Sequence, residues 1–366
     1  MTLSRRRMIK AGLATVGAMS LLKGASADED RSEDQVIVDG LNTSRLDEAF
    51  VERIRRGGVD SVHLSMDGAL TYGKAYHFLD QHSDSIVLAK SVGDIIDAKA
   101  QGRIALIFGN QDALVIESEL VKTWRFTTLI QTLEAYHGLG LRIMGICYNT
   151  NNVFGGGILN PESPLTRAGR RLVEEIHKLN IILDVGGHTG ERTSLDAIEM
   201  SQGVPVICTH TNMAGLMPNV RAASDRLCEA VAATGGVVGL TAFSDFIIRS
   251  KDNYKAHGKT SPQATLNQHL DQYDYLKRLV GIDHMALGTD FNGGAGSTYF
   301  VKTEDSAIYT PDMLSDGFPR LVQGFQSLSE LGNVISGLEK RGWTQEELAK
   351  LLGGNWMRVY SKVWGR

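Results

Sequence analysis

Residues 181–210 read IILDVGGHTGERTSLDAIEMSQGVPVICTH, and this stretch decides the fold. It opens with a short apolar run, Ile181–Gly187, and closes with a second one, Pro205–His210. Between the two runs, Thr193 can cap a helix over Ser194–Ser201. Two neighbouring strands joined by a helix run parallel, because the crossover returns the chain to the edge at which the first strand began. The stretch therefore predicts one strand–helix–strand unit of a parallel sheet.

The same alternation continues along most of the chain. Eight short β-branched or apolar runs are separated by stretches with helical periodicity: Val36–Asp39, Ser61–Met66, Arg103–Gly109, Leu141–Tyr148, Ile181–Gly187, Pro205–His210, Val237–Phe243 and His284–Asp290. Eight strand–helix units close into a (β/α)8 barrel. The alternative is an open doubly wound sheet, but no glycine-rich dinucleotide motif follows the first run. We therefore predict an α/β fold, a TIM barrel of eight parallel strands with extra C-terminal helices.

Capping side chains mark where several of the helices begin. The predicted starts are Ser163-Pro164 before a helix over Leu165–Leu179, Ser224 before Asp225–Ala233, Thr265 before a helix that runs to about Val280, and a capping box at Thr344-Gln345-Glu346-Glu347.

Composition and charge are those of an ordinary globular protein. The 366 residues are 42% hydrophobic and 22% charged, and the formal net charge is −4. This charge does not favour nucleic acid or an anionic membrane as a partner. No segment of the mature chain is apolar over the length that a bilayer requires. We predict no nucleic-acid partner and no stable membrane span.

The first 27 residues have the pattern of an export signal. Arg5-Arg6-Arg7 precedes a modest apolar stretch, Ala11–Leu22, and the small residues Ala25-Ser26-Ala27 follow. The pattern predicts a twin-arginine signal peptide that the export machinery reads and that is removed after Ala27. Residues 28–366 then form one mature domain, periplasmic or otherwise exported. The alternative is a basic N-terminal anchor that stays attached, but the apolar stretch is shorter than the ~20 residues of a spanning helix.

Polar side chains end several of the predicted strands, and the carboxyl ends of barrel strands carry the function. His188 follows the fifth run, His210 ends the sixth and Asp290 ends the eighth. Imidazole and carboxylate groups are the usual ligands of a catalytic zinc ion, which activates water for attack. Asp290 can also serve as general acid and base. Each histidine alone also fits a hydrogen-bonded structural residue, but their neighbouring strand ends favour a shared metal site.

Four segments around these residues resemble motifs of the renal (membrane) dipeptidases, a family of the metallo-dependent hydrolase superfamily. Residues 184–194, DVGGHTGERTS, resemble the family's Asp-Leu-Ser-His segment, and residues 206–212, VICTHTN, resemble its Ser-His-Ser segment. Residues 221–225, RAASD, are similar to its Arg-Asn-x-x-Asp, and residues 286–293, ALGTDFNG, to its Gly-x-Gly-Ser-Asp-Phe-Asp-Gly. The resemblance covers nearly all of the mature chain.

The resemblance implies a (β/α)8 barrel with two bridged zinc ions that cleaves dipeptides, some of them with a D-residue at the carboxyl end. By position, it makes His188 and His210 ligands of the second zinc. It makes Asp290 a ligand of the first zinc and the acid/base residue. Arg221 would bind the substrate carboxylate, whose two oxygens suit a guanidinium fork.

The chain departs from the family pattern at the first zinc. The family's first strand ends Asp-Gly-His-x-Asp, whereas residues 39–43 read DGLNT. The bridging glutamate position holds Gln111, the substrate-binding histidine position holds Tyr148, and one extra residue separates Asp184 from His188. We therefore predict one zinc ion rather than two. Its predicted ligands are His188, His210, Asp290 and Gln111, and the predicted substrate-binding residues are Arg221, Tyr148 and Asn149.

Three functions are consistent with such a site. The first is an exported metal-dependent hydrolase that cleaves a small peptide or amide, and the sequence favours it. The second is a non-hydrolytic tailoring enzyme for a small exported molecule. The third is a metal-free pseudoenzyme that binds a carboxylate-bearing ligand through Arg221. The sequence does not decide the oligomeric state, for which a homodimer is one option.

Overall fold

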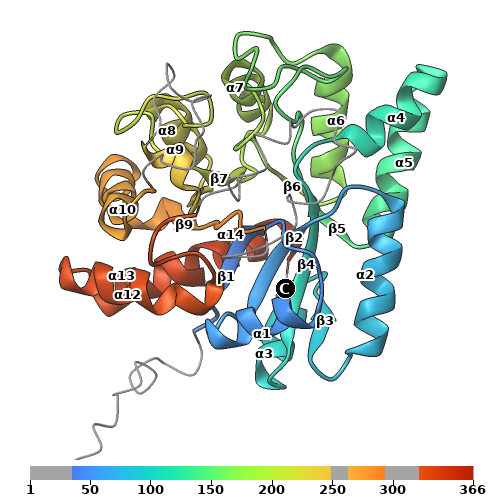
Figure 1. Cartoon of the computed structure of the whole chain (residues 1–366). Coiled ribbons are helices and arrows are strands. Elements are labelled where there is room, and N and C mark those ends of the chain that lie inside the picture. The colour runs from blue at the N-terminus through green and yellow to red at the C-terminus, as the bar shows by residue number, and fades with distance from the viewer. Residues whose placement is uncertain (1–34, 249–262, 293–320, 366) are drawn as a thin grey trace, which may run out of the picture. The chain divides into compact units, whose positions relative to one another are not determined.

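Parallel strands in two sheets form the centre of the protein in the computed structural model, which describes residues 35–248, 263–292 and 321–365 (Figure 1). The strands are β1 (Val38–Asn42), β2 (Ser61–Ser65), β3 (Ile86–Leu88), β4 (Ile104–Asn110), β5 (Leu141–Met144), β6 (Ile182–Leu183), β7 (Ile207–Thr211), β8 (Val237–Leu240) and β9 (Met285–Leu287). One sheet has the order β1-β2-β4-β5-β6, with β3 paired to the start of β4. The other has the order β7-β8-β9.

Helices alternate with the strands and pack outside the sheets (Figure 1). They are α1 (Glu48–Arg56), α2 (Ala69–Gln81), α3 (Val92–Ala100), α4 (Leu114–Thr123), α5 (Phe126–Gly138), α6 (Arg167–Lys178), α7 (Glu191–Met200), α8 (Asp225–Ala233), α9 (Ser244–Ile248), α10 (Leu266–Val280), α12 (Leu331–Lys340), α13 (Gln345–Ala349) and α14 (Asn355–Trp364). None of the helices in the described ranges has the length and apolar character needed to cross a membrane.

The predicted α/β fold with a parallel sheet is confirmed, and each of the eight predicted runs overlaps a strand. Two features differ from the prediction. The ladders form a curled sheet of six strands and a separate sheet of three, instead of one closed sheet. The strand β3 was not predicted, because only three residues of it pair with β4 and two of these are half-buried. Its apolar signal is therefore too short to stand out.

Two contacts outside the ladders link the two sheets. Asp184, directly after β6, forms an isolated parallel bridge with Ile207 at the start of β7. Asn42, at the end of β1, forms another with Phe291, which follows β9. The strands at these boundaries are short, since β6 has two residues and β9 has three. One isolated bridge, outside the ladders of both sheets, links β6 to β7, and the other links β9 to β1.

The helix starts test the predicted caps individually. Ser224 accepts a hydrogen bond from the backbone N–H of Leu227 and caps α8 as predicted. The capping boxes of Thr265 and Thr344 are also present. The structure contradicts Thr193 as a cap, because α7 begins at Glu191 with Gly190 in the cap position, so Thr193 lies inside the helix. The Thr193 hydroxyl instead donates to the backbone oxygen of Ser163.

The start of α6 differs from the prediction for a related reason. Its cap is Thr166, whose hydroxyl accepts from the backbone N–H of Gly169, and not Ser163. The backbone oxygen of Ser163 accepts a hydrogen bond from the Thr193 hydroxyl on α7. The segment before α6 is therefore held against α7 and does not form the first turn of α6. Both errors come from tertiary contacts that override a local capping signal.

The C-terminal helix α14 packs against β1 at Gly40 and against β9. Trp356 is fully buried, and its indole N–H donates to the backbone oxygen of Leu287 in β9 at 2.9 Å. A Cβ atom at Gly40 would lie 2.1 Å from the Trp356 ring, so only glycine allows this close approach to β1. The predicted signal peptide, residues 1–27, lies outside the described residues.

Candidate active site

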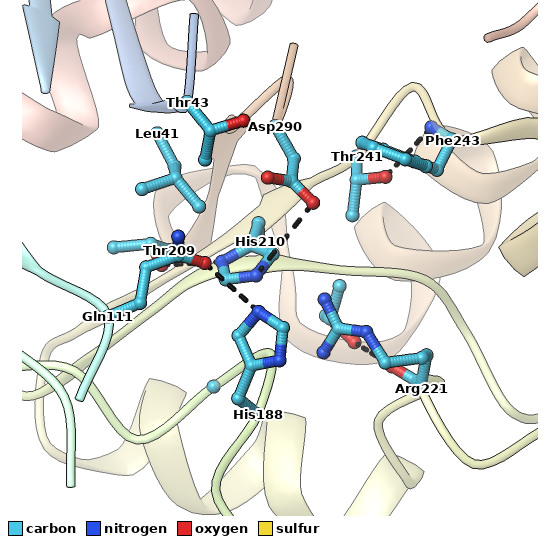
Figure 2. Close-up of polar contacts among 12 residues, drawn as sticks. Leu41, Thr43, Gln111, His188, Thr209, His210, Arg221, Thr241, Phe243 and Asp290 are labelled. Carbon is cyan, nitrogen blue, oxygen red and sulfur yellow. Dashed lines mark hydrogen bonds and ion pairs between the residues drawn. The ribbon is translucent and has the colours of Figure 1, made fainter. Parts of the chain in front are cut away.

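The four side chains predicted to bind zinc lie together at the carboxyl ends of the strands (Figure 2). Gln111 follows β4, His188 follows β6, His210 lies in β7 and Asp290 follows β9. The ring centroids of His188 and His210 are 5.1 Å apart. Nε2 of His210 lies 4.0 Å from Oδ2 of Asp290. Both histidines and the aspartate are buried, so the fold removes three ionisable groups from solvent at one point.

His210 presents an unpaired nitrogen to Asp290. Its Nδ1 lies 2.8 Å from the hydroxyl of Thr209, and that hydroxyl donates its proton to Asp184 at 2.5 Å. The hydroxyl can therefore only accept from His210, which places the ring proton on Nδ1. Nε2 is left with a lone pair, and it is buried without a hydrogen-bond partner. Burial and the nearby Arg221 hold the pKa of His210 well below its usual range, so the ring is neutral.

His188 lies between two side-chain amides. Its Nδ1 is 2.7 Å from Oδ1 of Asn149, and its Nε2 is 3.0 Å from Oε1 of Gln111. Burial, with Arg221 and His210 nearby, lowers the pKa of His188 well below its usual range. A neutral imidazole carries one N–H, so His188 can donate to only one of the two amide oxygens. If Nδ1–H donates to Asn149, the lone pair of Nε2 is available to a cation beside Gln111.

Tyr148 covers His188 on its outer side. The two rings stack with centroids 3.8 Å apart and an interplanar angle of 21°. Tyr148 is 47% exposed, so it lies between the buried ring of His188 and solvent. The next residue, Asn149, has a left-handed backbone with φ 61°, a conformation that asparagine adopts more readily than most residues. Both predicted substrate-binding residues of this loop therefore touch His188 directly.

Asp290 combines burial with an unusual backbone. Its φ is 57°, which is uncommon for a residue other than glycine, and its backbone N–H donates to the oxygen of Leu41 at 2.9 Å. Burial raises the pKa of its carboxyl group to about 7, against the opposing effect of Arg221 and with a smaller contribution from Asp39. A carboxyl group with a pKa near neutrality can both take up and release a proton at physiological pH.

Arg221 supplies the positive charge of the site. It is buried, and its guanidinium group lies 4.8 Å from the centre of the Phe246 ring. Its backbone N–H donates to the side-chain oxygen of Asn219, which fixes the loop between β7 and α8. Its Nη1 is buried and has no hydrogen-bond partner. A buried guanidinium nitrogen without a partner suits an anionic ligand such as a carboxylate.

Gly187 allows the two histidines to approach each other. Its φ is +74°, and a Cβ atom there would lie 2.2 Å from Cε1 of the His210 ring. The preceding Gly186 is equally crowded, because its Cβ would lie 1.9 Å from Sγ of Cys208. The extra residue between Asp184 and His188 is therefore accommodated by a glycine pair that packs against β7.

Comparisons with known proteins place this geometry in a family. The family model of the membrane dipeptidases, peptidase family M19, matches residues 49–310 and 312–364. The chain belongs to the membrane dipeptidase family. An uncharacterized protein in the pqqA 5′ region of Klebsiella pneumoniae is 32% identical over 241 residues, which are 63% of this chain and 76% of that protein. Dipeptidase tcpJ of Claviceps purpurea is 24% identical over 291 residues, 78% of this chain and 57% of that protein.

A solved structure supports the same relationship. The crystal structure of an amidohydrolase from Pseudomonas aeruginosa matches with a TM-score of 0.77 and 28% identity, and it covers 91% of this chain and 98% of that chain. The structural neighbours are thus of the amidohydrolase TIM-barrel type. The predicted membership of the dipeptidase-type metallohydrolases is confirmed.

Among the described residues, the end of β1 offers no strong zinc ligand at the two positions where the family has them. Leu41 and Thr43 occupy the positions of the family's histidine and aspartate, and both lie beside Asp290 in Figure 2. Leu41 is fully buried, and the Thr43 hydroxyl donates to the backbone oxygen of Phe291. Across the described residues, no three or more His, Cys, Asp and Glu side chains are grouped closely enough to hold a metal ion as they stand. A two-zinc centre therefore does not fit these residues.

A single ion fits better, because one donor is already free. The Nε2 atom of His210 is buried, unpaired and directed at the carboxylate of Asp290. His188 can add a second imidazole if its contact with Gln111 opens, and the oxygen of Gln111 is itself a ligand that divalent ions accept.

Four residues of this site were not predicted. Asp184 and Asp39 are buried carboxylates, and each accepts hydrogen bonds from a threonine, Thr209 or Thr289, that directly precedes His210 or Asp290. The sequence does contain a signal for them. A threonine precedes the polar residue at two strand ends, and the apolar run of the neighbouring strand contains an aspartate in both cases.

Proposed function

We propose that the protein is an exported metal-dependent hydrolase of the dipeptidase type that cleaves a small peptide or amide. The observation that supports this most directly is the unpaired, buried Nε2 of His210, which faces the Asp290 carboxylate at 4.0 Å. A buried acceptor with no donor costs about 1–3 kcal/mol, and such a cost is retained where a ligand satisfies the group. A divalent cation between an imidazole and a carboxylate would do so.

The cation that we propose is one zinc ion bound by His188, His210 and Asp290, with Gln111 as an additional donor. Nitrogen and carboxylate oxygen are the ligand types of catalytic zinc sites. When bound, zinc polarises the scissile carbonyl group and makes water a better nucleophile near neutral pH. The remaining steps depend on the chain's own side chains.

Arg221 would bind the carboxylate at the end of the substrate through its unpaired Nη1. Asp290, whose pKa burial raises to about 7, would take a proton from the attacking water and deliver it to the leaving amine. Tyr148 and Asn149 would line the substrate side of His188, which they already contact by stacking and hydrogen bonding. This arrangement fits a short substrate with a free carboxyl end.

We also infer that the two sheets together form one closed barrel of eight strands, with β3 outside it. The bridges Asp184–Ile207 and Asn42–Phe291 support this inference, since they connect β6 to β7 and β9 to β1. Backbone hydrogen bonds accompany both bridges, at 2.8 Å from Val185 to Ile207 and at 2.7 Å from Thr43 to Phe291. The site then lies where eight strand ends converge, as in other TIM-barrel enzymes.

Export rests on the sequence of the first 27 residues. We propose that this segment is a twin-arginine signal, and that residues 28–366 act as one domain in the periplasm or an equivalent exported location. N-terminal sequencing of the protein from the native host tests this directly. A mature chain that begins at Asp28 supports the proposal, and a chain that retains Arg5-Arg6-Arg7 in the cytoplasm contradicts it.

Metal analysis together with a dipeptide panel tests the function. We expect about one zinc per purified chain and hydrolysis of some dipeptides, including those with a D-residue at the carboxyl end. Asp290→Asn should abolish hydrolysis, because an amide cannot carry the proton. The matched control is Asp283→Asn, which removes an exposed carboxylate paired with Lys350 at the opposite end of β9 from Asp290.

Two results would redirect the proposal. Zinc without hydrolysis of any dipeptide would favour a tailoring enzyme for another small exported molecule. The other result is a protein that binds no zinc after incubation with zinc, yet binds a small carboxylate only when Arg221 is present. That result would favour the metal-free ligand-binding protein. Either outcome contradicts the proposed hydrolase.

A further inference from the structure

Asp184 forms an unusual set of hydrogen bonds at the boundary between β6 and β7. Its Oδ1 accepts from the backbone N–H groups of Gly186 and Thr209, both at 3.0 Å. Its Oδ2 accepts from the Thr209 hydroxyl at 2.5 Å. In a parallel ladder the backbone N–H of Thr209 would bond to a carbonyl group of the adjacent strand. Here a side-chain carboxylate takes the place of that carbonyl.

The same device occurs at the other boundary, between β9 and β1. Asp39 accepts from the backbone N–H of Thr289 at 2.8 Å and from its hydroxyl at 2.7 Å. Both aspartates are buried, and both bind the threonine that directly precedes a side chain of the candidate site. The same arrangement therefore occurs independently at both boundaries where an isolated bridge links the two sheets, which makes an accident of packing a poor explanation.

The two occurrences differ in what the threonine touches next. The Thr209 hydroxyl lies 2.8 Å from Nδ1 of His210, so the hydrogen bonds run from imidazole to hydroxyl to carboxylate. The Thr289 hydroxyl instead accepts from the backbone N–H of Phe291 at 3.3 Å and thereby brackets Asp290. Only the first chain ends on a group whose proton can sit on either of two atoms.

We propose that Asp184 is a positioning residue that acts through Thr209 to hold His210 in the Nδ1–H tautomer, which leaves Nε2 free to bind a ligand. A carboxylate can only accept, so the Thr209 hydroxyl must donate to it and can only accept from His210. The imidazole proton is thereby fixed on Nδ1. This arrangement replaces the direct contact between a carboxylate and a ligating histidine that often orients metal-binding imidazoles.

Asp184→Asn makes the sharpest test, because the two side chains have nearly the same shape. The asparagine oxygen can still accept from the Thr209 N–H, but its NH2 group would point at the Thr209 hydroxyl. The hydroxyl then accepts from the amide and donates its own proton to Nδ1 of His210. The ring must take the Nε2–H tautomer, which blocks the lone pair that faces Asp290.

The measurement is the tautomer of His210 in the metal-free protein, read from long-range 1H–15N correlations of the imidazole and assigned with His210→Gln. We expect the Nδ1–H form in the wild type and the Nε2–H form in Asp184→Asn. The matched control is Asp39→Asn, the same change in the pair that ends on no histidine, and it should leave the His210 tautomer unchanged. A folded Asp184→Asn protein that keeps the Nδ1–H form overturns the proposal.

A second pair of variants applies if Asp184→Asn does not fold. Thr209→Ser keeps the hydroxyl and should retain the Nδ1–H form, whereas Thr209→Val removes it and should give a mixture of tautomers. Thr241→Val, at the end of β8, removes a threonine hydroxyl that accepts only a local backbone N–H in Figure 2 and should retain the wild-type form. Equal spectra for the serine and valine variants at position 209 would overturn the proposal.

Zinc affinity gives a second readout, which rests on the proposed function. We expect Asp184→Asn to weaken zinc binding by about 10–100-fold, the usual effect of losing a partner of a ligating histidine. The two inferences can fail separately. A wild-type protein that binds no zinc contradicts the proposed hydrolase but leaves the tautomer result intact. An unchanged tautomer overturns the role of Asp184 whatever the zinc measurement shows.

Discussion

The strand ends of β6 and β7 and the strand end of β1 face the same site, but they have diverged differently from the membrane dipeptidase pattern. The first group keeps His188 and His210. The second has Leu41 and Thr43 where the family pattern has a histidine and an aspartate. We call the first group the retained half of the site and the second group the replaced half. Yet Asp39, within β1, accepts a hydrogen bond from the Thr289 hydroxyl, just as Asp184 accepts one from the Thr209 hydroxyl in the retained half.

The residues at the zinc-ligand positions differ between the two halves, whereas the hydrogen bonds that hold the strand ends do not. In the replaced half, the buried hydrogen bonds between Asp39 and Thr289 are present, because they also connect the two sheets. Their loss would leave buried polar groups unpaired, which costs about 1–3 kcal/mol each. The bonds between Asp39 and Thr289 do not involve the side chains of Leu41 and Thr43. The two strand ends therefore differ at the family's zinc-ligand positions but share the same hydrogen bonds between an aspartate and a threonine, which we call the frame of the site.

Removing His210 tests the retained half and has the largest expected effect. His210→Ala should weaken zinc binding by more than about 100-fold and abolish hydrolysis, because it removes the imidazole nitrogen that is unpaired and faces Asp290. Equilibrium dialysis with zinc measures this. The matched control is His269→Gln, a buried histidine on α10 that packs on Tyr273, and it should bind zinc like the wild type. Undiminished zinc binding by His210→Ala would place the metal elsewhere.

Restoring the family's ligands to the replaced half tests whether its backbone can still support a second zinc ion. Leu41→His combined with Thr43→Asp should raise the zinc content from about one to about two ions per chain, because both positions already lie beside Asp290 (Figure 2). Inductively coupled plasma mass spectrometry gives the count. Each single substitution should stay near one ion, since a second ion needs both new ligands. A double variant that folds and stays at one would show that the frame of this half has changed as well.

Much of the fold could be predicted because its signals are local. The eight apolar runs and the caps at Ser224 and Thr265 each depend on a few neighbouring residues, and each is present in the structure. The cap assigned to Thr193 failed because its hydroxyl contacts Ser163, thirty residues away. No local pattern records such a contact.

The candidate site divides in the same way. His188, His210 and Asp290 could be predicted because polar residues at the ends of apolar runs are conspicuous in sequence. Asp184 and Thr209 were missed as functional residues. A threonine inside a strand is an ordinary β-branched strand former, and its bond to a carboxylate on the other sheet appears only once the strands are placed.

Arg221 belongs to the retained half and offers a smaller, separable effect. Arg221→Met should raise KM for a dipeptide by about 10–100-fold with a lesser change in kcat, since the guanidinium is expected to bind the unreacting carboxylate end. Arg221→Lys should recover part of the loss. Steady-state kinetics on a good dipeptide substrate measures both. Arg278→Met, an exposed arginine beside Tyr275, is the control. An effect on kcat alone would move Arg221 from substrate binding to the reacting centre.

The smallest expected effect concerns the frame that both halves share, and it appears in the pH dependence of stability. Burial raises the pKa of Asp39 and of Asp184 from 3.8 to about 6. Each group therefore favours the folded state fully below pH ~4, and this contribution is lost as the pH rises through about 6, because the unfolded chain ionises first. The buried histidines, whose pKa values are lowered, contribute the opposite slope. The wild type must therefore be compared with a variant at each pH.

Urea unfolding of the metal-free protein gives that difference. The free energy of unfolding of the wild type minus that of Asp39→Asn should fall by about 1–3 kcal/mol between pH 4 and pH 7, and Asp184→Asn should give a similar fall. Equal slopes would show that the two halves retain the same frame. A slope for Asp184 alone would mean that the half without zinc ligands has lost its carboxylate support in solution, and the contrast between ligands and frame would no longer hold.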